Sequence, residues 1–132
     1  MRSIVVDVTQ IGPSTSQVAI RSHTVQVDRP VDKGGSDRGP MGGELLLASL
    51  GGCFVSTLLA AVRAREAAVS EVRVTVTGEV GGTPERFERI SMQVSARHQD
   101  ENLMRKLLDI AERGCLVTNT LKAAMPITVE LV

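Results

Sequence analysis

The stretch Leu45–Val62, LLLASLGGCFVSTLLAAV, decides the fold, because it runs for 18 residues without one charged side chain. Its length and apolar character alone are compatible with a membrane span. Small and polar residues such as Ser49, Gly51 and Gly52 interrupt the run, and the rest of the chain has the patterns of soluble sheet and amphipathic helix. We therefore predict a helix over 44–68 that is buried in a small protein or in a dimer, with no membrane association.

The two adjacent glycines in this predicted helix point to a close contact. Each costs about 1 kcal/mol in a helix interior relative to alanine. Gly51 and Gly52 therefore predict that another segment approaches the helix backbone closely at this point.

Segments on both sides of the helix alternate as β-strands do. Apolar residues alternate over 4–9 and again over 17–27, with turn residues at 12–14 between them. Between 21 and 24 the apolar positions change from even to odd numbers, which predicts a break or bulge there. After the helix, 72–77 and 90–96 each keep apolar residues on one face.

The C-terminal part of the chain has helix signals followed by one more strand pattern. Asp100 is suited to cap a helix that ends near Gly114, and a second short helix is predicted from Cys115. The alternating sequence ITVELV at 127–132 predicts a closing strand. This order of elements predicts an α+β fold, a single domain over 1–132, with mostly antiparallel sheets packed on the long buried apolar helix.

Composition excludes several classes of function. The 132 residues carry 15 basic and 15 acidic side chains, with two Phe and no Trp or Tyr, so neither a positive field nor stacking aromatics favour a nucleic-acid partner. Two cysteines are too few for a secreted disulfide framework, and MRSIVVDVTQ lacks signal-peptide features, which predicts a cytoplasmic protein. No spacing of Cys and His suggests a metal site, and no nucleotide motif suggests a cofactor.

Cys53 and Cys115 are the candidate reactive residues. Cys53 follows the two glycines in the apolar helix, and Cys115 stands at the start of the last predicted helix. Free cysteine often packs as a small buried hydrophobe, so a purely structural role is one interpretation. The other is a dithiol pair in which one thiolate attacks a peroxide oxygen and the second thiol condenses with the sulfenic acid.

Two stretches of sequence support the second interpretation. GPMGGELLLASLGGC at 39–53 and AERGCLVTNTLKAAMPITVEL at 111–131 resemble the OsmC/Ohr family of osmotically inducible and organic hydroperoxide resistance proteins. The resemblance implies an intertwined homodimer with two active sites at the subunit interface. It also implies a thiol-dependent peroxidase for organic hydroperoxides or hydrogen peroxide, with Cys53 as the peroxidatic thiol, Cys115 as the resolving thiol and a dithiol as reductant.

The same resemblance implies an arginine, held by a glutamate, beside the peroxidatic cysteine. Gly43 stands where the family has the glutamate, and Glu44 is the nearest carboxylate. Arg29 and Arg38 are the candidate arginines, with Lys33 between them as a further cation. Alternatively, Glu44 only stabilises the first turn of its helix, and the two arginines are solvated loop residues.

Function therefore has competing interpretations at this stage. In the first, an organic hydroperoxide with an apolar fatty or aryl group is reduced by the thiol pair. In the second, the same scaffold is a noncatalytic small-molecule binding protein, with an anionic group held where residues 39–43 lead into a helix N-terminus. A purely structural dimer is the third.

Overall fold

The computed structural model describes residues 1–123 and 125–132 and confirms the α+β class with antiparallel sheets and a long helix. The chain divides into two compact units, Met1–Leu46 and Leu47–Val132. The boundary falls inside the long helix, and the single domain over 1–132 stays a prediction.

A three-stranded antiparallel sheet forms the first unit. Its strands are β1 (Asp7–Gln10), β2 (Ser16–Ile20) and β3 (His23–Val27), in that spatial order. The chain turns between β2 and β3 at Arg21, which has a φ of 53°. The change of parity in the sequence is therefore a tight turn, which lets each strand keep its own alternation.

The glycine-rich segment after β3 is ordered by close backbone contacts. It contains one short 3-10 helix, η1 (Val31–Lys33). Gly35 lies against the backbone of Arg29, and a Cβ on Gly35 would fall 1.9 Å from the Arg29 carbonyl oxygen. Only glycine fits there, which is why this loop can fold back on itself.

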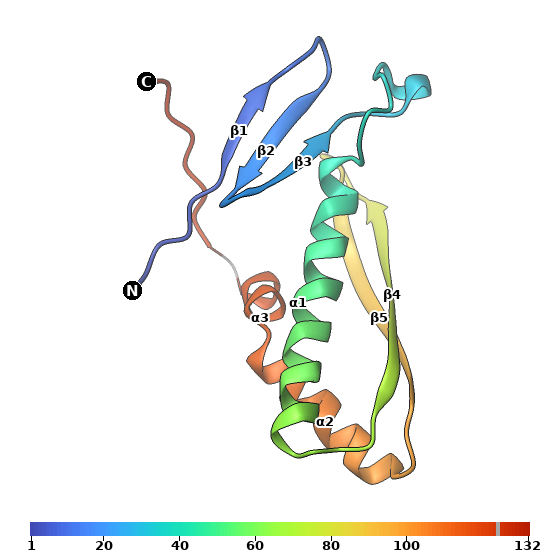
Figure 1. The fold of residues 1–132 in the computed structure, drawn as a ribbon. Helices are drawn as coiled ribbons and strands as arrows, with labels where there is room; N and C mark the ends of the chain where they lie inside the picture. Colours follow the sequence, from blue (N-terminus) through green and yellow to red (C-terminus); the bar gives the residue numbers. More distant parts are fainter. Residues whose placement is uncertain (124) are drawn as a thin grey trace. The chain divides into compact units, whose positions relative to one another are not determined.

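The second unit contains most of α1 (Gly42–Ala64) and a two-stranded hairpin of β4 (Ser70–Gly81) and β5 (Arg86–Arg97). The hairpin runs alongside α1 (Figure 1). The alternation predicted for both strands is confirmed, because the register pairs Val74 with Val94 and Val76 with Met92 on one half-buried face. This face supplies one wall of the unit's core.

The two glycines of α1 differ in their surroundings. A Cβ on Gly51 would lie 2.9 Å from a methyl carbon of Val76, so β4 approaches the helix there as predicted. At Gly52 a Cβ would meet nothing within 4 Å among the described residues. The prediction of a close approach is thus confirmed for Gly51 and wrong for Gly52 within this chain.

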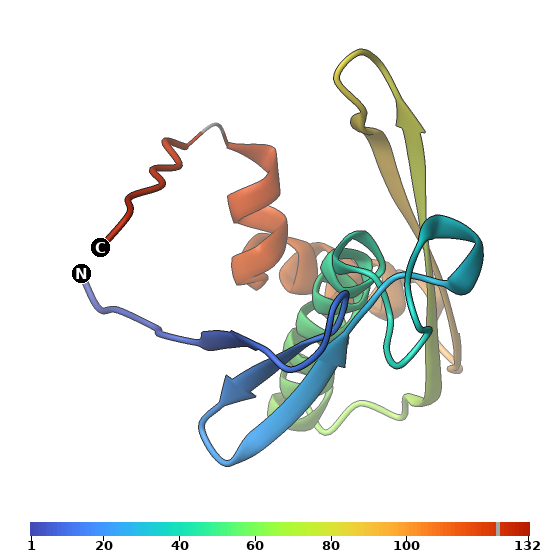
Figure 2. The same cartoon turned by 90° about the horizontal axis from the view of Figure 1, so that it is seen from above.

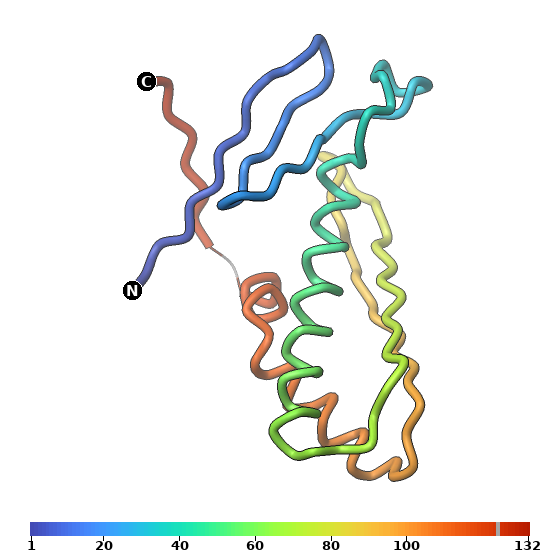
Figure 3. Tube along the Cα trace, viewed as in Figure 1, coloured from blue at the N-terminus to red at the C-terminus, as the bar shows by residue number. Residues whose placement is uncertain are grey.

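Two further helices complete the second unit. Asp100 caps α2 (Glu101–Gly114) by accepting a hydrogen bond of 3.0 Å from the Leu103 amide, as predicted. α3 (Leu116–Lys122) follows after one residue, and the Cα trace turns sharply between the two helices (Figure 3). In two perpendicular views α3 and the hairpin lie on opposite sides of α1 (Figure 2).

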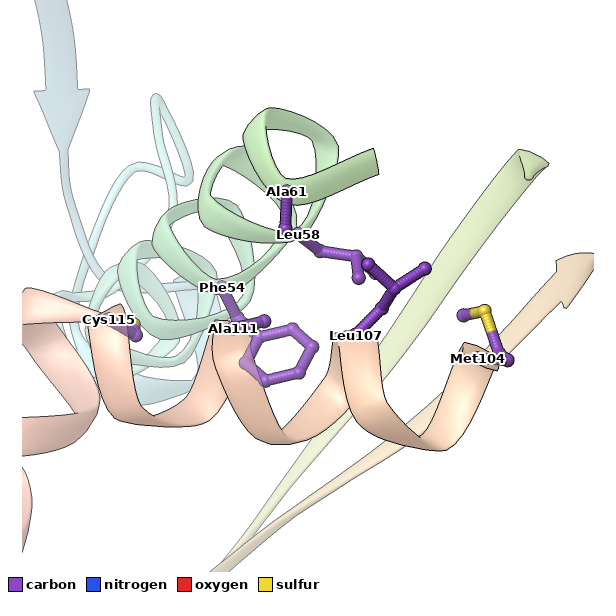
Figure 4. Close-up of a cluster of buried hydrophobic side chains, with 7 residues drawn as sticks. All are labelled: Phe54, Leu58, Ala61, Met104, Leu107, Ala111 and Cys115. Carbon is purple, nitrogen blue, oxygen red and sulfur yellow. The ribbon is translucent and has the colours of Figure 1, made fainter. Parts of the chain in front are cut away.

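The core of this unit forms where α1 crosses α2. Side chains from the two helices face each other in Figure 4: Phe54, Leu58, Ala61, Met104, Leu107, Ala111 and Cys115. Leu58 and Leu107 are completely buried. α1 is long and apolar enough to cross a membrane, and one face of it packs against α2 and the hairpin, but only 33% of its apolar window is buried within this chain, so the predicted full burial of the helix is not seen in one chain.

The predicted closing strand is wrong for this chain. Residues 127–132 form no helix or strand, and Val129 is 95% exposed. The alternation that predicted a strand is real, but a strand also needs a neighbour for its backbone hydrogen bonds. Within the described residues no such neighbour pairs with it.

Candidate functional site

The two cysteines, 62 positions apart in the sequence, meet inside the second unit. Cys53 is on α1, half-buried, and Cys115 joins α2 to α3 with 0% of its surface exposed. Cys53 packs against the buried cluster that contains Cys115, and its thiol is one of the groups that lower the pKa of the Cys115 thiol. Both are free cysteines. The structure therefore brings together the two residues that a dithiol reaction requires.

The helix ends explain this arrangement. Phe54 and Leu58 face the core, which fixes the rotation of α1 and turns Cys53 toward the end of α2. Gly114 leaves room for this approach, since a Cβ on it would lie 3.1 Å from a methyl carbon of Thr57. The chain can therefore leave α2 close against α1 and place Cys115 beside Cys53.

Cys115 is the N-cap of α3, in an extended backbone conformation with φ of −80° and ψ of 114°. Its sulfur accepts a hydrogen bond of 3.4 Å from the Thr118 amide. Burial raises the pKa of the Cys115 thiol, but hydrogen bonds from the side chain and amide of Thr118, from the Cys53 thiol and from the Val117 amide outweigh it and lower that pKa below its ordinary value. Cys115 is thus disposed to ionise.

Thr118 is a site residue that the sequence interpretation missed. It is 6% exposed, and its hydroxyl oxygen has no hydrogen-bond partner in good geometry among the described residues. The amide of the same residue donates to Cys115 Sγ at 3.4 Å, which holds the Thr118 side chain near that sulfur. Its position three residues after an N-cap is the signal that could have identified it.

A cavity of about 550 Å³ lies within the second unit. Its apolar walls come from α1, β5, α2 and α3, and include Leu50, Phe54, Ile90, Met92 and Leu108. Neither cysteine lines this cavity, but Thr118 does, and Thr118 contacts Cys115. An apolar molecule in the cavity would therefore lie one side chain away from the sulfurs.

An ion pair stands at the rim of this cavity. Lys122 on α3 binds the carboxylate of Glu112 on α2. The hydrogen bond and the charge of Lys122 lower the pKa of Glu112. The Lys122 side chain is 62% exposed and the Glu112 side chain 50%, so the pair links α3 to α2 without adding much stability.

The other predicted site residues belong to the first unit. Glu44 accepts a hydrogen bond of 2.8 Å from the Met41 amide, which satisfies one of the free N–H groups at the start of α1. Arg38 and Glu44 line a smaller cavity of about 350 Å³. Arg29 and Arg38 are exposed and make no ion pair with the described residues.

The loop that carries both arginines is organised around Asp28, which the sequence interpretation also missed. Asp28 is 2% exposed and accepts hydrogen bonds from the Thr15 hydroxyl (2.7 Å) and from the amides of Arg29 (2.7 Å) and Arg38 (3.3 Å). Burial raises the pKa of Asp28, but these hydrogen bonds lower it well below its usual range. A buried carboxylate thus fixes the backbone of the two arginines.

Comparison with known proteins identifies the family. The family model described as OsmC-like protein matches residues 34–130, which lie on both sides of the unit boundary. A comparison with curated proteins gives no match.

Solved structures with the same fold come from several bacteria. A candidate osmotic stress induced and detoxification response protein of Psychrobacter arcticus is 18% identical with a TM-score of 0.78, and the match covers 91% of this chain and 90% of that one. An organic hydroperoxide resistance protein of Elizabethkingia anophelis is 19% identical with a TM-score of 0.72, and the match covers 92% of this chain and 89% of that one. An organic hydroperoxide resistance protein OsmC of Legionella pneumophila is 17% identical with a TM-score of 0.64, and the match covers 92% of this chain and 90% of that one. Because the family model spans most of the chain and the fold agrees, the protein belongs to the OsmC-like family.

Proposed function

We propose that this protein reduces organic hydroperoxides, or hydrogen peroxide, with Cys53 as the peroxidatic thiol and Cys115 as the resolving thiol. The observation that carries the proposal is that two free cysteines pack in one cluster, with Cys53 the more accessible of the pair. The structural relatives from Elizabethkingia anophelis and Legionella pneumophila are organic hydroperoxide resistance proteins, which also supports this proposal.

The proposed chemistry balances without a metal or a bound cofactor. Cys53 first loses its proton to solvent and becomes the reactive thiolate. The Cys53 thiolate attacks the peroxide, so a sulfur–oxygen bond forms, the oxygen–oxygen bond breaks, and the alkoxide takes a proton from solvent to leave as an alcohol. Cys115 then attacks the Cys53 sulfenic acid, and the disulfide forms as water leaves with the Cys115 proton. A cellular dithiol reduces this disulfide and is itself oxidised.

The apolar cavity supports an organic substrate. Its side walls are aliphatic or aromatic over most of their residues, and such surface favours a fatty or aryl group over a small polar peroxide. We expect turnover of cumene hydroperoxide to exceed that of hydrogen peroxide when both are measured with an excess of dithiol. A clear preference for hydrogen peroxide would contradict the role given to the cavity.

We also propose roles in this reaction for three residues of the first unit. Arg29 or Arg38 supplies the cation that stabilises the Cys53 thiolate, and Glu44 orients it. Arg38 has the stronger support, because it lines the same cavity as Glu44. Separate Arg29→Ala and Arg38→Ala variants test this point: the variant that loses peroxide turnover while keeping its unfolding temperature identifies the arginine, and unchanged turnover in both rejects the role.

We further propose that the functional form is a cytoplasmic homodimer. Only about a third of the apolar part of α1 is buried in one chain, and Ile127, Val129 and Leu131 are left exposed. A second copy could cover these surfaces and pair with the alternating C-terminal segment. Light scattering on the purified full chain should give the mass of two chains, and the mass of one chain at all concentrations would reject the dimer.

The competing proposal is a noncatalytic binding protein for an apolar small molecule, which the 550 Å³ cavity favours. The anionic version of this proposal is weakened, because the Glu44 carboxylate already accepts the Met41 amide at the start of α1. Titration of free thiols after one equivalent of cumene hydroperoxide separates the two functions. The peroxidase loses both thiols of each chain, and a binding protein loses neither.

A further inference from the structure

We infer that Thr118 is a positioning residue for the resolving step: its buried hydroxyl donates to Cys115 Sγ and stabilises the negative charge that this sulfur carries when it attacks Cys53. The inference rests on the proposed function. It adds a residue that acts through Cys115.

The geometry of Thr118 is the first support. Its amide is 3.4 Å from Cys115 Sγ, so its backbone position is tied to that sulfur. Its side chain is 6% exposed, which removes water as an easy partner for the hydroxyl. A buried hydroxyl without a partner costs free energy, so its retention here calls for an acceptor that is present in some state of the site.

A Cys115 thiolate is that acceptor. A neutral thiol accepts hydrogen bonds weakly, whereas a thiolate is a charged acceptor and gains more from each donor. The hydroxyl therefore gains its partner when the sulfur becomes negative. Its stabilising effect is largest in the step where Cys115 gives up its proton and attacks the sulfenic acid.

A neighbouring threonine shows that this arrangement is specific to Thr118. Thr120 lies on the same helix, but its hydroxyl donates 2.8 Å to the Leu116 carbonyl oxygen, which is the usual partner within a helix. Thr118 makes no such bond. Thr120→Val is therefore a matched control, since it is the same change on the same helix without a hydroxyl directed at the thiol pair.

The first measurement needs no peroxide. In a Cys53→Ser background, Cys115 is the remaining cysteine, and with no Trp or Tyr in the chain its thiolate can be followed by ultraviolet absorbance against pH. Loss of one charge-assisted hydrogen bond predicts that Thr118→Val raises the titration midpoint by about one pH unit. Thr118→Ser should restore the midpoint, and Thr120→Val should not move it.

The second measurement follows disulfide closure in the chain with both cysteines. A midpoint one unit higher reduces the thiolate fraction about tenfold, but the remaining thiolate is more nucleophilic, so closure should slow roughly threefold in Thr118→Val. Thr118→Ala removes the hydroxyl with less apolar bulk and repeats both measurements if valine disturbs the packing.

The outcomes separate the inference from the proposed function. A raised midpoint with slower closure, both restored by serine, supports the inference. A midpoint unchanged in both Thr118→Val and Thr118→Ala overturns it, even if peroxide still oxidises both thiols. If peroxide oxidises neither thiol in the unsubstituted protein, the proposed function fails, and the resolving role of Thr118 fails with it.

Discussion

The proposed chemistry of this protein depends on the surroundings of two thiol groups. Cys53 and Cys115 pack in the same cluster, and Cys115 is the fully buried sulfur and accepts a hydrogen bond from the Thr118 amide. This difference assigns separate tasks to the pair. In the proposed mechanism, the accessible Cys53 sulfur reacts with the peroxide and the buried Cys115 sulfur then closes the disulfide.

Replacing Cys53 or Cys115 should therefore block different steps of the peroxide reaction. Cys53→Ser should abolish peroxide consumption, because no accessible nucleophile remains. Cys115→Ser should still consume about one equivalent of peroxide per chain and accumulate a sulfenic acid that a dimedone-type reagent labels. Mass spectrometry of the labelled protein checks this, and labelling of the Cys53→Ser variant at Cys115 would reverse the assignment.

Asp28 makes the first unit sensitive to acid. The pKa of its carboxyl is held below the ordinary value of 3.8, so the charged form stabilises the fold above about pH 4, and this contribution is lost as the pH falls further. Asp28→Asn places an amide among donors and should lower the thermal unfolding midpoint at neutral pH. The difference from the unsubstituted protein should shrink below pH 4, and a difference independent of pH would show that the carboxylate charge is unimportant.

At the scale of elements, local sequence patterns predict much and neighbours decide the rest. Alternation in 72–77 and 90–96 predicts β4 and β5, and Asp100 predicts the start of α2, because each signal acts within a few residues. The C-terminal alternation at 127–132 fails because pairing requires a second strand, which the described part of the chain does not provide.

Gly51 tests the contact between α1 and β4. Gly51→Ala would add a methyl group 2.9 Å from Val76, whose branched side chain has little freedom to move, so the gain in helix propensity should be exceeded by overpacking of about 1–3 kcal/mol. Gly42→Ala is the control in the first turn of the same helix, where nothing lies within 4 Å. Denaturant unfolding should show a loss for Gly51→Ala alone, and equal stability of both variants would contradict the contact.

At the scale of the whole molecule, the helix crossing of the second unit is both its core and the support of its site. Leu107 is completely buried opposite Leu58, and the same layer of side chains continues to Cys115. The site is therefore built on rigid elements, and its geometry depends on the packing of this layer.

Leu107→Ala should destabilise the protein by about 2–5 kcal/mol, the usual range for a buried leucine that leaves a cavity. Leu116→Ala, at a position 56% exposed, is the matched control and should change stability by less than about 0.5 kcal/mol. Urea unfolding followed by circular dichroism measures both. Similar losses in the two variants would show that the α1–α2 crossing is not the main core.

The sequence predicted the thiol pair better than its surroundings, and the reason is physical. Cys53 and Cys115 are rare residues in distinctive contexts, so each can be found alone. Thr118 and Asp28 are ordinary residue types whose importance comes from burial and from hydrogen bonds to distant or capped positions. No periodic pattern records the contacts of Asp28, which join positions far apart in the chain, whereas Thr118 has only its place three residues after the N-cap as a signal.

Peptide mapping after oxidation tests the dithiol mechanism most directly. The purified protein is treated with one equivalent of cumene hydroperoxide, blocked with an alkylating reagent and digested without reduction. The mechanism predicts one new species, the peptide of Cys53 joined to that of Cys115 within the same chain, which disappears after dithiol treatment. Recovery of both cysteines as alkylated thiols, or their linkage only between chains, would contradict it.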